Sequence, residues 1–484
     1  MTLSDDYRHD LAPSLFVFPY TFTYYKKYTM HRRIHIKNAT IVNEGRKFIG
    51  SIVIDDERIA EVLEGFDCKP ELPADEVFDA TGCYVFPGVI DDHVHFRDPG
   101  LTYKADFDTE SKAAAAGGVT TVLDMPNCVP PTASREALKE KIEIAKAKSH
   151  VNYGFFFGAT SENAEELHQL NKRHTVGIKL FMGNSTGNLK VENAEALNTV
   201  FRNSKLPIMV HCEDTDMVDE AMAKAREEYA GGEIPISEHS RIRSAECCYR
   251  STELAVRLAR ENNARLHVAH ISTARELELF TPGDTRITAE VCLPHLLFCD
   301  EDYARLGARI KCNPSVKTRA DRDALRSALN DGRIYCIGTD HAPHTIDDKR
   351  GGAGRAASGI PMVQFSLCSM LELVDEGVLS IERLVTLMCH NPAERFCIEN
   401  RGYIRPGYMA DLVVVRPNSP WTLATRMILS KCNWSPMEGH VFKWRILRTY
   451  VNGYMLYHNG HITNENHHGL QITFTPDHFK RNDR

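Results

Sequence analysis

The middle of the chain alternates short apolar runs with amphipathic stretches of helical periodicity. The helical stretches include residues 134–149, 161–173 and 241–263. Eight apolar runs of strand length lie between such stretches: VFPGVIDDHVHF, GVTTVLDMPN, VNYGFFFGAT, VGIKLFM, PIMVHCED, ARLHVAHIS, ITAEVCLPH and IYCIGTDHAPH. This alternation predicts an α/β fold with eight parallel strands, the pattern of a TIM (β/α)8 barrel. A doubly wound open sheet is the alternative, because it gives the same pattern over a shorter window.

The two ends of the chain show a different pattern. Residues 34–85 consist of short alternating runs broken by Asn, Gly and Asp, and a matching pattern returns in residues 402–417 and 446–460. We therefore expect a small β-sandwich domain built from both chain ends. Its bounds would be residues 30–85 and 401–484, with the barrel inserted as residues 86–400.

Residues 1–29 precede both domains. Their middle is apolar, but acidic residues come before it and no small-residue cleavage site follows, so a signal peptide is the less favoured reading. We expect an extension that is disordered or reflects a start upstream of the natural one at Met30.

Composition narrows the class of partner. Hydrophobic residues make up 43% and charged residues 25% of the chain, which is typical of a globular protein with a large core. The net charge of −7 does not favour binding to nucleic acid or to an anionic membrane, both of which attract positively charged proteins. No apolar run reaches the roughly 20 residues that span a bilayer. The fourteen cysteines show neither zinc-finger spacing nor a disulfide framework. These features predict a cytoplasmic protein that acts on a small molecule.

Polar side chains gather at the carboxyl ends of the predicted strands. In a barrel these ends converge on one mouth, where active sites lie, so we expect a shared pocket there. The residues are His93, His95, Asn127, Lys179, His211, His270 and Asp340.

Several of these residues suit a metal site. His93 and His95 point to the same face of a strand, where both can reach one cation at about 2.0–2.1 Å. The plainer reading is a pair of polar residues that end a strand. His211 and His270, taken singly, are more often hydrogen-bonded core histidines. The carboxylate of Asp340 is expensive to bury unless it is paired or bound to a metal. Their joint occurrence favours two adjacent metal ions.

Lys179 is the unexpected member of this set, because an ammonium would repel the cations that its neighbours hold. The lysine could pair with a carboxylate or form a Schiff base. A third option is a neutral amine, its pKa lowered by burial and nearby cations, that adds carbon dioxide to form a carbamate. The carbamate would be an anionic bridging ligand.

The motifs together carry a family resemblance. They are HVHFR at 93–97, DMPN at 124–127, GIKL at 177–180, His211, His270, CNP at 312–314 and DHAPH at 340–344. With them, residues 30–460 resemble the dihydroorotases of the amidohydrolase superfamily. The resemblance implies that His93, His95 and Asp340 bind one zinc ion, that His211 and His270 bind the other, and that carboxylated Lys179 bridges them. Some members use a bridging aspartate, so the role of Lys179 depends on the branch of the family.

The resemblance also implies a reaction. Dihydroorotases cyclise N-carbamoyl-L-aspartate reversibly to L-dihydroorotate in de novo pyrimidine biosynthesis. Ring opening would proceed by attack of a metal-bridged hydroxide on the ring amide, with Asp340 as proton shuttle.

Substrate choice would depend on Arg97. Its guanidinium can bind a carboxylate through two parallel hydrogen bonds, with Asn127 in support. The alternative is an arginine paired with Asp98 or Asp106 at the barrel rim.

The resemblance implies two further substrate contacts, Asn313 and His344, with the ring and its carboxylate. The plainer reading of Asn313 is a turn former before Pro314, and that of His344 is a hydrogen-bonded loop residue.

Three rival functions remain open. The first is a related cyclic amidase such as allantoinase or dihydropyrimidinase, which has no substrate carboxylate for Arg97 to bind. The second is a non-catalytic scaffold of the same superfamily, although such proteins typically lose metal ligands and this chain keeps all six. The third is an aldolase that uses Lys179 as a Schiff base. The native metal and the oligomeric state are also open, with a homodimer as one option.

Overall fold

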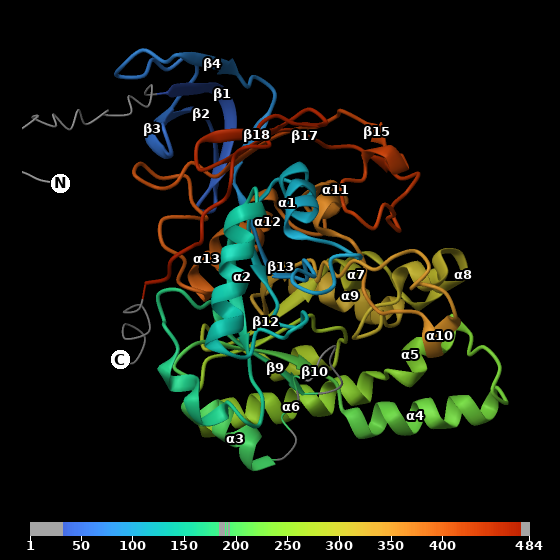
Figure 1. The fold of residues 1–484 in the computed structure, drawn as a ribbon. Helices are drawn as coiled ribbons and strands as arrows, with labels where there is room; N and C mark the ends of the chain where they lie inside the picture. Colours follow the sequence, from blue (N-terminus) through green and yellow to red (C-terminus); the bar gives the residue numbers. More distant parts are fainter. Residues whose placement is uncertain (1–31, 183–188, 190, 192–193, 476–484) are drawn as a thin grey trace, which may run out of the picture. The chain divides into compact units, whose positions relative to one another are not determined.

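The computed structural model describes residues 32–182, 189, 191 and 194–475. The predicted extension, residues 1–29, lies outside the described residues. Figure 1 shows the barrel strands and helices below a sheet that contains segments from both ends of the described chain.

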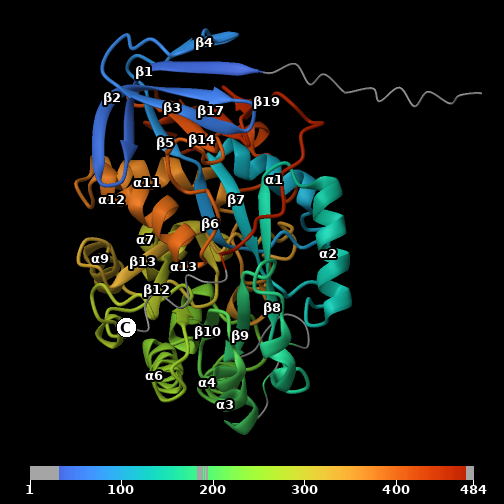
Figure 2. The ribbon, with the colours of Figure 1, turned by 90° about the vertical axis from the view of Figure 1, so that its left-hand side faces the viewer.

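Eight parallel strands form the barrel, in the order in which they occur along the chain (Figure 2). The first and last strands approach each other, since the backbone N–H of His95 donates to the carbonyl of His341 at 2.8 Å and the Thr339 hydroxyl donates to Asp91 at 2.6 Å. The predicted TIM barrel is therefore confirmed. The strands are β6 (Val89–Val94), β7 (Val119–Asp124), β8 (Asn152–Gly158), β9 (Gly177–Met182), β10 (Ile208–Cys212), β11 (Leu266–Val268), β12 (Ile287–Cys292) and β13 (Ile334–Gly338).

The barrel strands are buried along nearly their whole length. Parallel strands covered on both faces consist of near-continuous apolar runs, which is why the sequence pattern located all eight. Helices cover the outside: α1 (Phe107–Ala116), α2 (Arg135–Lys148), α3 (Ala194–Asn203), α4 (Thr215–Glu228), α5 (His239–Ile242), α6 (Ala245–Glu261), α7 (Leu293–Leu297), α8 (Tyr303–Leu306), α9 (Arg319–Ala328), α10 (Gly352–Arg355), α11 (Ser366–Asp375), α12 (Ile381–Val385) and α13 (Asn391–Arg395).

One predicted helix is wrong. Within residues 161–173 only a short 3₁₀ helix forms, η1 (Ala164–Gln169). The buried apolar side chains are Ala164, Leu167 and Leu170, a strict spacing of three that fits three residues per turn rather than 3.6. Asn163 also donates to the carbonyls of Ala133 and Gly158, which holds the start of the segment to a neighbouring loop and strand.

The second sheet combines both ends of the chain. Its strand order is β19-β18-β17-β14-β5-β1-β2-β3, with β4 paired to β1, and β15 and β16 form a separate pair. The predicted small β domain from both ends is confirmed, whereas its exact boundary with the barrel stays a prediction. The strands are β1 (Arg33–Asn43), β2 (Arg46–Asp55), β3 (Arg58–Glu64), β4 (Glu76–Asp79), β5 (Tyr84–Pro87), β14 (Leu412–Arg416), β15 (Trp421–Thr422), β16 (Val441–Phe442), β17 (Arg445–Val451), β18 (Tyr454–His458) and β19 (His461–Ile462).

A buried polar network joins the small sheet to the barrel. The Asp411 carboxylate, 3% exposed, accepts hydrogen bonds from Asn152 at the start of β8 and from the backbone N–H of Asn452 in the β17–β18 turn. It also forms an ion pair with buried Arg401.

Within the described part of the chain, no helix has both the length and the apolar character that crossing a bilayer requires.

We predict that Asp411→Ala lowers the free energy of unfolding by about 3–5 kcal/mol, because it leaves the buried charge of Arg401 without its partner. Chemical denaturation would measure the loss, and Glu64→Ala, which removes an exposed partner of Arg46, should change stability by less than about 1 kcal/mol. A loss for Asp411→Ala no larger than that of Glu64→Ala would contradict this role.

Candidate metal centre

A cavity at the carboxyl ends of the barrel strands brings the predicted ligands together. It is lined by His93, His95, Lys179, His211, His270 and Asp340, together with Arg97, Asn127, Phe181, Asn313, Ala342, Ser358 and Gly359. His344 does not line it but lies beside Arg97. The sequence-predicted residues thus meet in one place, although they come from seven different strands or the connections that follow them.

Three ligand atoms face a common point on one side of the cavity. The Oδ1 atom of Asp340 lies 3.0 Å from Nε2 of His95 and 3.5 Å from Nε2 of His93. Two ligands of a tetrahedral ion with bonds of about 2.1 Å are separated by roughly 3.4 Å. The spacing of this group therefore fits one divalent ion.

Two histidine nitrogens face each other on the other side. Nδ1 of His211 lies 3.0 Å from Nε2 of His270, and the ring of His270 also lies 5.2 Å from that of His93. The two imidazoles can share one ion next to the first, because each presents a ring nitrogen to the same point. The donor set, four imidazoles with a carboxylate, suits zinc and other divalent transition metals.

The opposite nitrogen of three of these histidines is held by an acceptor. His93 donates through Nδ1 to Glu290 at 3.0 Å, and His95 donates through Nδ1 to Asn127 at 2.7 Å. His211 donates through Nε2 to Glu213 at 3.0 Å. Such hydrogen bonds fix the tautomer and turn the other nitrogen, with its lone pair, toward the ion.

Glu290 and Glu213 are the two functional candidates that sequence reasoning missed. Glu290 is fully buried in β12 and also accepts from the backbone N–H of His270 at 3.0 Å. The available signal was a carboxylate within the apolar run ITAEVC, since a buried carboxylate is expensive unless something pairs with it. Glu213 follows His211 by two residues and also forms an ion pair with Arg243.

Burial favours the neutral form of His93 and His95, which is the form able to bind a cation. Burial, together with the nearby charge of Lys179, lowers the pKa of His93 to about 3. Burial lowers the pKa of His95 to about 4. Metal ligation requires the unprotonated imidazole, so no proton has to be removed from these rings near neutral pH.

Lys179 projects from β9 into the cavity and is 1% exposed. Its Nζ atom has no hydrogen-bond partner and no ion pair among the described residues, and it lies 5.2 Å from the centre of the Phe181 ring. The salt bridge, one of the three options for Lys179, is therefore not formed with any described carboxylate. Burial lowers the pKa of Lys179, which favours the neutral amine that both carbamate and Schiff-base formation require.

Arg97 is buried and lines the same cavity. Its Nε donates to the carbonyl of Pro343 at 3.2 Å, and its Nη2 lies 3.2 Å from Nε2 of His344. The alternative pairing at the barrel rim is wrong, because Asp98 pairs with Lys148 and Asp106 with Lys431. Among the described residues Arg97 forms no ion pair, so no carboxylate there is in direct contact with its guanidinium in the cavity wall.

The remaining predicted residues take different places. Asn313 lines the cavity, and its Oδ1 atom is buried without a hydrogen-bond partner among the described residues. The ring of His344 lies 3.0 Å from both Lys104 Nζ and the carbonyl of Ser358. Burial and the charge of Arg97 lower the pKa of His344 to about 2. The predicted contacts of Asn313 and His344 with substrate stay predictions.

Comparison with known proteins places the chain in a family. The sequence pattern of the amidohydrolase family matches residues 84–454. The chain belongs to the amidohydrolase family. A dihydroorotase of Methanosarcina mazei is 32% identical over 84% of this chain and 90% of that protein. An allantoinase of Bacillus velezensis is 32% identical over 88% of this chain and 94% of that protein.

Solved structures of amidohydrolases share the fold. The L-hydantoinase (dihydropyrimidinase) from Arthrobacter aurescens superposes with a TM-score of 0.85 at 26% identity, covering 92% of this chain and all of that one. Amidohydrolases generally use a binuclear metal centre, and the His93–His95–Asp340 group is a candidate half of one.

We predict that Glu290→Gln weakens zinc binding by about 10- to 100-fold. The amide keeps the shape of the side chain but loses the negative charge that strengthens His93 as a ligand. Competition with a zinc chelator would measure the affinity.

Glu301→Gln is the matched control, because Glu301 is exposed and pairs only with Arg319 among the described residues. The control should bind zinc like the wild type. Equal affinity in Glu290→Gln would remove Glu290 from the metal centre.

Proposed function

We propose that this amidohydrolase is a dihydroorotase, which closes N-carbamoyl-L-aspartate to L-dihydroorotate and opens the ring in the reverse direction. Membership of the family supports the broader statement that the chain is a metal-dependent cyclic amide hydrolase. The observation that carries the narrower proposal is Arg97, a buried cation without an ion-pair partner among the described residues, in the wall of the ligand-lined cavity.

The charge of Arg97 discriminates between the cyclic amides. Dihydroorotate carries a carboxylate on its ring, whereas allantoin, hydantoin and dihydrouracil do not. A buried guanidinium can bind that carboxylate through two parallel hydrogen bonds, and it costs free energy to leave the guanidinium without an anion. The cavity is therefore better suited to an acidic ring than to a neutral one.

The ligand geometry supports a pair of divalent ions, which we propose to be zinc. His93, His95 and Asp340 would hold one ion, His211 and His270 the other, and a carbamate on Lys179 would join them. Such ions lower the pKa of bound water and polarise an amide carbonyl, which is what hydrolysis of an unactivated amide requires.

Asp340 is the residue that we assign to proton transfer. Its carboxylate lines the cavity and lies next to the ring nitrogens of both His93 and His95, where the attacking water would be. It can accept the proton of that water and pass it to the departing ring nitrogen. In ring closure the same carboxylate takes the proton from the attacking ureido nitrogen and delivers it to the leaving oxygen.

Asn127 and Asn313 would complete the substrate site. The Oδ1 atom of Asn127 accepts a hydrogen bond from His95. The amide N–H groups of Asn127 can then donate to a ligand. Asn313 lines the cavity with an oxygen that has no partner in the described part of the chain and that suits an N–H of the ring. His344 would act through Arg97, since its ring lies against that guanidinium.

A second candidate function has some support. Relatives of this chain include proteins named allantoinase and L-hydantoinase, at levels of similarity close to those of the dihydroorotases. A related cyclic amidase would use the same ligands but would leave Arg97 without a role. The scaffold alternative is weaker, because the six residues that we propose as ligands all line one cavity.

We also propose a reducing, cytoplasmic setting. All fourteen cysteines are free thiols, and all except Cys68 and Cys432 are buried. Free thiols at this number are typical of reducing compartments. The partner would be the small-molecule substrate alone, and a homodimer stays a prediction.

We predict that Arg97→Met lowers kcat/KM for ring closure of N-carbamoyl-L-aspartate by about 30-fold or more while zinc content stays unchanged. Truncating one partner of a buried, hydrogen-bonded charge pair costs about 2 kcal/mol or more. Steady-state kinetics would be run beside Arg257→Met, which removes an exposed arginine on α6. Wild-type turnover by Arg97→Met, or faster turnover of allantoin or dihydrouracil than of dihydroorotate, would contradict the proposed dihydroorotase activity.

We predict that Lys179 carries a carbamate in the zinc-loaded protein. Protein loaded with zinc in ¹³C-bicarbonate should give a carbamate carbon resonance that is absent from Lys179→Met and retained in Lys148→Met, which alters a half-exposed lysine. A resonance that survives in Lys179→Met would exclude this residue as the site. Reduction by borohydride in the presence of substrate, with a covalent adduct on Lys179, would favour the aldolase instead.

A further inference from the structure

A second group of potential metal ligands lies next to the candidate metal centre, between the end of β10 and the start of α6. Its members are Glu213, Cys247 and Cys248, and the three donor atoms all lie within 4.8 Å of one another. Glu213 follows β10 directly, and the two cysteines are the third and fourth residues of α6. All three side chains are buried, with at most 1% exposure.

The two carboxylate oxygens of Glu213 have different surroundings. Oε2 accepts a hydrogen bond from Nε2 of His211 at 3.0 Å and pairs with Arg243. Oε1 is buried and has no hydrogen-bond partner among the described residues. A buried oxygen without a partner costs free energy, and a cation bound at this point would offset that cost.

The two thiols have weak partners at present. Cys247 donates to the carbonyl of Ser244 at 3.1 Å, and Cys248 accepts from the hydroxyl of Ser272 at 3.7 Å. Because sulfur is a weak donor and a weak acceptor, bonds to a metal can replace these contacts at small cost. Thiolates prefer zinc and similar ions to ions that bind oxygen.

The spacing of the donor atoms is close to what such an ion needs. Two sulfur ligands at about 2.3 Å from a tetrahedral ion are roughly 3.8 Å apart. The donor atoms, which lie within 4.8 Å of one another, would therefore have to approach by only about 1 Å.

The surroundings of the cysteines favour the thiolate, which is the form that binds a metal. Contact with the Cys248 thiol lowers the pKa of Cys247, and the positive charges of Lys317 and Arg243 act in the same direction. Burial and the charge of Glu213 act in the opposite direction. The first turn of α6 adds the partial positive charge of a helix amino-terminus.

The positive charges of Lys317 and Arg243 also select the kind of ion. When one divalent ion replaces two thiol protons, the net charge of this region does not change. An ion that binds without thiolates, such as Mg²⁺, would instead add two positive charges near Lys317 and Arg243. The region is therefore suited to an ion that binds sulfur.

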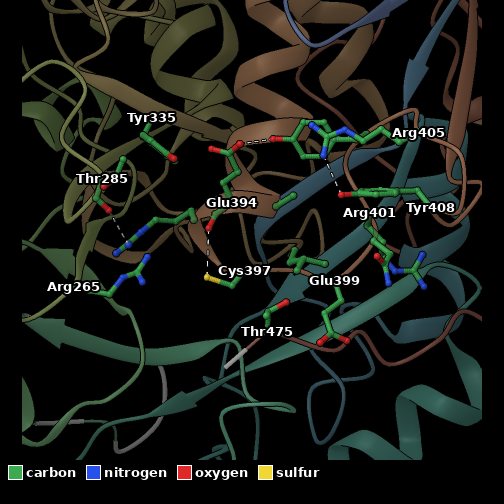
Figure 3. Close-up of a pocket in the computed structure, with 15 residues that line it drawn as sticks. Arg265, Thr285, Tyr335, Glu394, Cys397, Glu399, Arg401, Arg405, Tyr408 and Thr475 are labelled. Carbon is green, nitrogen blue, oxygen red and sulfur yellow. Dashed lines mark hydrogen bonds between the residues drawn. The ribbon is translucent and has the colours of Figure 1, made fainter. Parts of the chain in front are cut away.

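A cavity of about 590 Å³ at the opposite end of the barrel provides a contrast (Figure 3). Its wall includes Thr285 before β12 and Tyr335 near the start of β13. Cys397 lines it and donates to the carbonyl of Glu394, but no second thiol and no imidazole is among the described residues of this wall. Cys397 is thus a buried cysteine without the other ligands of a metal site, which makes it a suitable control.

We propose that Glu213, Cys247 and Cys248 bind a further metal ion, a divalent cation of the zinc and cadmium class. The site is separate from the candidate centre in the barrel mouth, because none of the six residues proposed as ligands there belongs to it. Glu213 would bind the ion with one oxygen and His211 with the other. The proposal goes beyond the ring-opening function and does not depend on it.

Titration of the reduced wild-type protein with cadmium tests the site. The six candidate ligands of the barrel mouth offer nitrogen and oxygen atoms, whereas the proposed site offers two sulfur atoms. We expect ultraviolet charge-transfer absorption from thiolate to cadmium, and a ¹¹³Cd NMR resonance typical of two sulfur ligands. Cadmium-saturated protein without this absorption would refute the proposal, and so would a resonance typical of one sulfur ligand or of none.

Competition between ions tests the selectivity. Zinc should displace the cadmium and abolish the charge-transfer absorption, whereas magnesium at the same concentration should leave it unchanged. Failure of zinc to displace cadmium, or displacement by magnesium, would contradict the assignment to this class of ion.

Two substitutions locate the ion, with folding checked by circular dichroism. Cys247→Ser and Cys248→Ser should each lower the cadmium affinity measured by the charge-transfer absorption at least tenfold. Cys397→Ser should bind cadmium like the wild type. Undiminished affinity in both Cys247→Ser and Cys248→Ser, or an equal loss in Cys397→Ser, would overturn the proposal. None of these measurements uses ring closure, so failure of this site and failure of the dihydroorotase assignment are distinguishable.

Discussion

The structure depends on the burial of a cluster of polar side chains, the candidate metal ligands, each of which would be costly to bury alone. Imidazoles, a carboxylate and an amine lie within a few ångströms of one another at the barrel mouth, largely out of contact with water. Each loses hydration on burial, and the loss is offset only if neighbours or bound cations replace the water. Rigid parallel strands make this possible, because each strand fixes one or two side chains and no loop has to order the whole set.

Hydrogen bonds behind the ligands set their direction. Glu290 holds His93 and the backbone of His270 together, and Glu213 holds His211. These carboxylates do not line the cavity, yet they determine which nitrogen of each ring faces it. The centre is therefore built from two layers, and substitution of the outer layer should alter metal affinity without removing a ligand.

The two ends of the barrel balance charge in different ways. At the mouth, Arg97 and Lys179 have no ion-pair partners among the described residues, in a cavity that also holds Asp340. At the opposite end, Arg401 forms an ion pair with Asp411 in the network that joins the small sheet to β8, whereas Arg395 forms none within the described stretches of the chain. Buried arginines of similar exposure thus differ in whether a carboxylate pairs with them, which depends on the folded position of the nearest carboxylate.

The sequence by itself determined the features that depend on local periodicity and residue chemistry. Apolar runs located all eight barrel strands, the spacing of His93 and His95 placed both on one face, and the position of Lys179 at the end of a predicted strand placed it in the same pocket. Tertiary structure decided the choices among distant partners. Glu290 lies 197 residues from His93 in the chain, and Asp98 pairs with Lys148 rather than with its neighbour Arg97. Residues 161–173 have the pattern expected of a helix but form only η1, because hydrogen bonds from Asn163 to a neighbouring loop and strand hold the start of the segment. Periodicity is a property of a few neighbouring residues, so it can be found in the sequence. Hydrogen bonds and ion pairs form between groups that the fold brings close together, at any separation in the sequence.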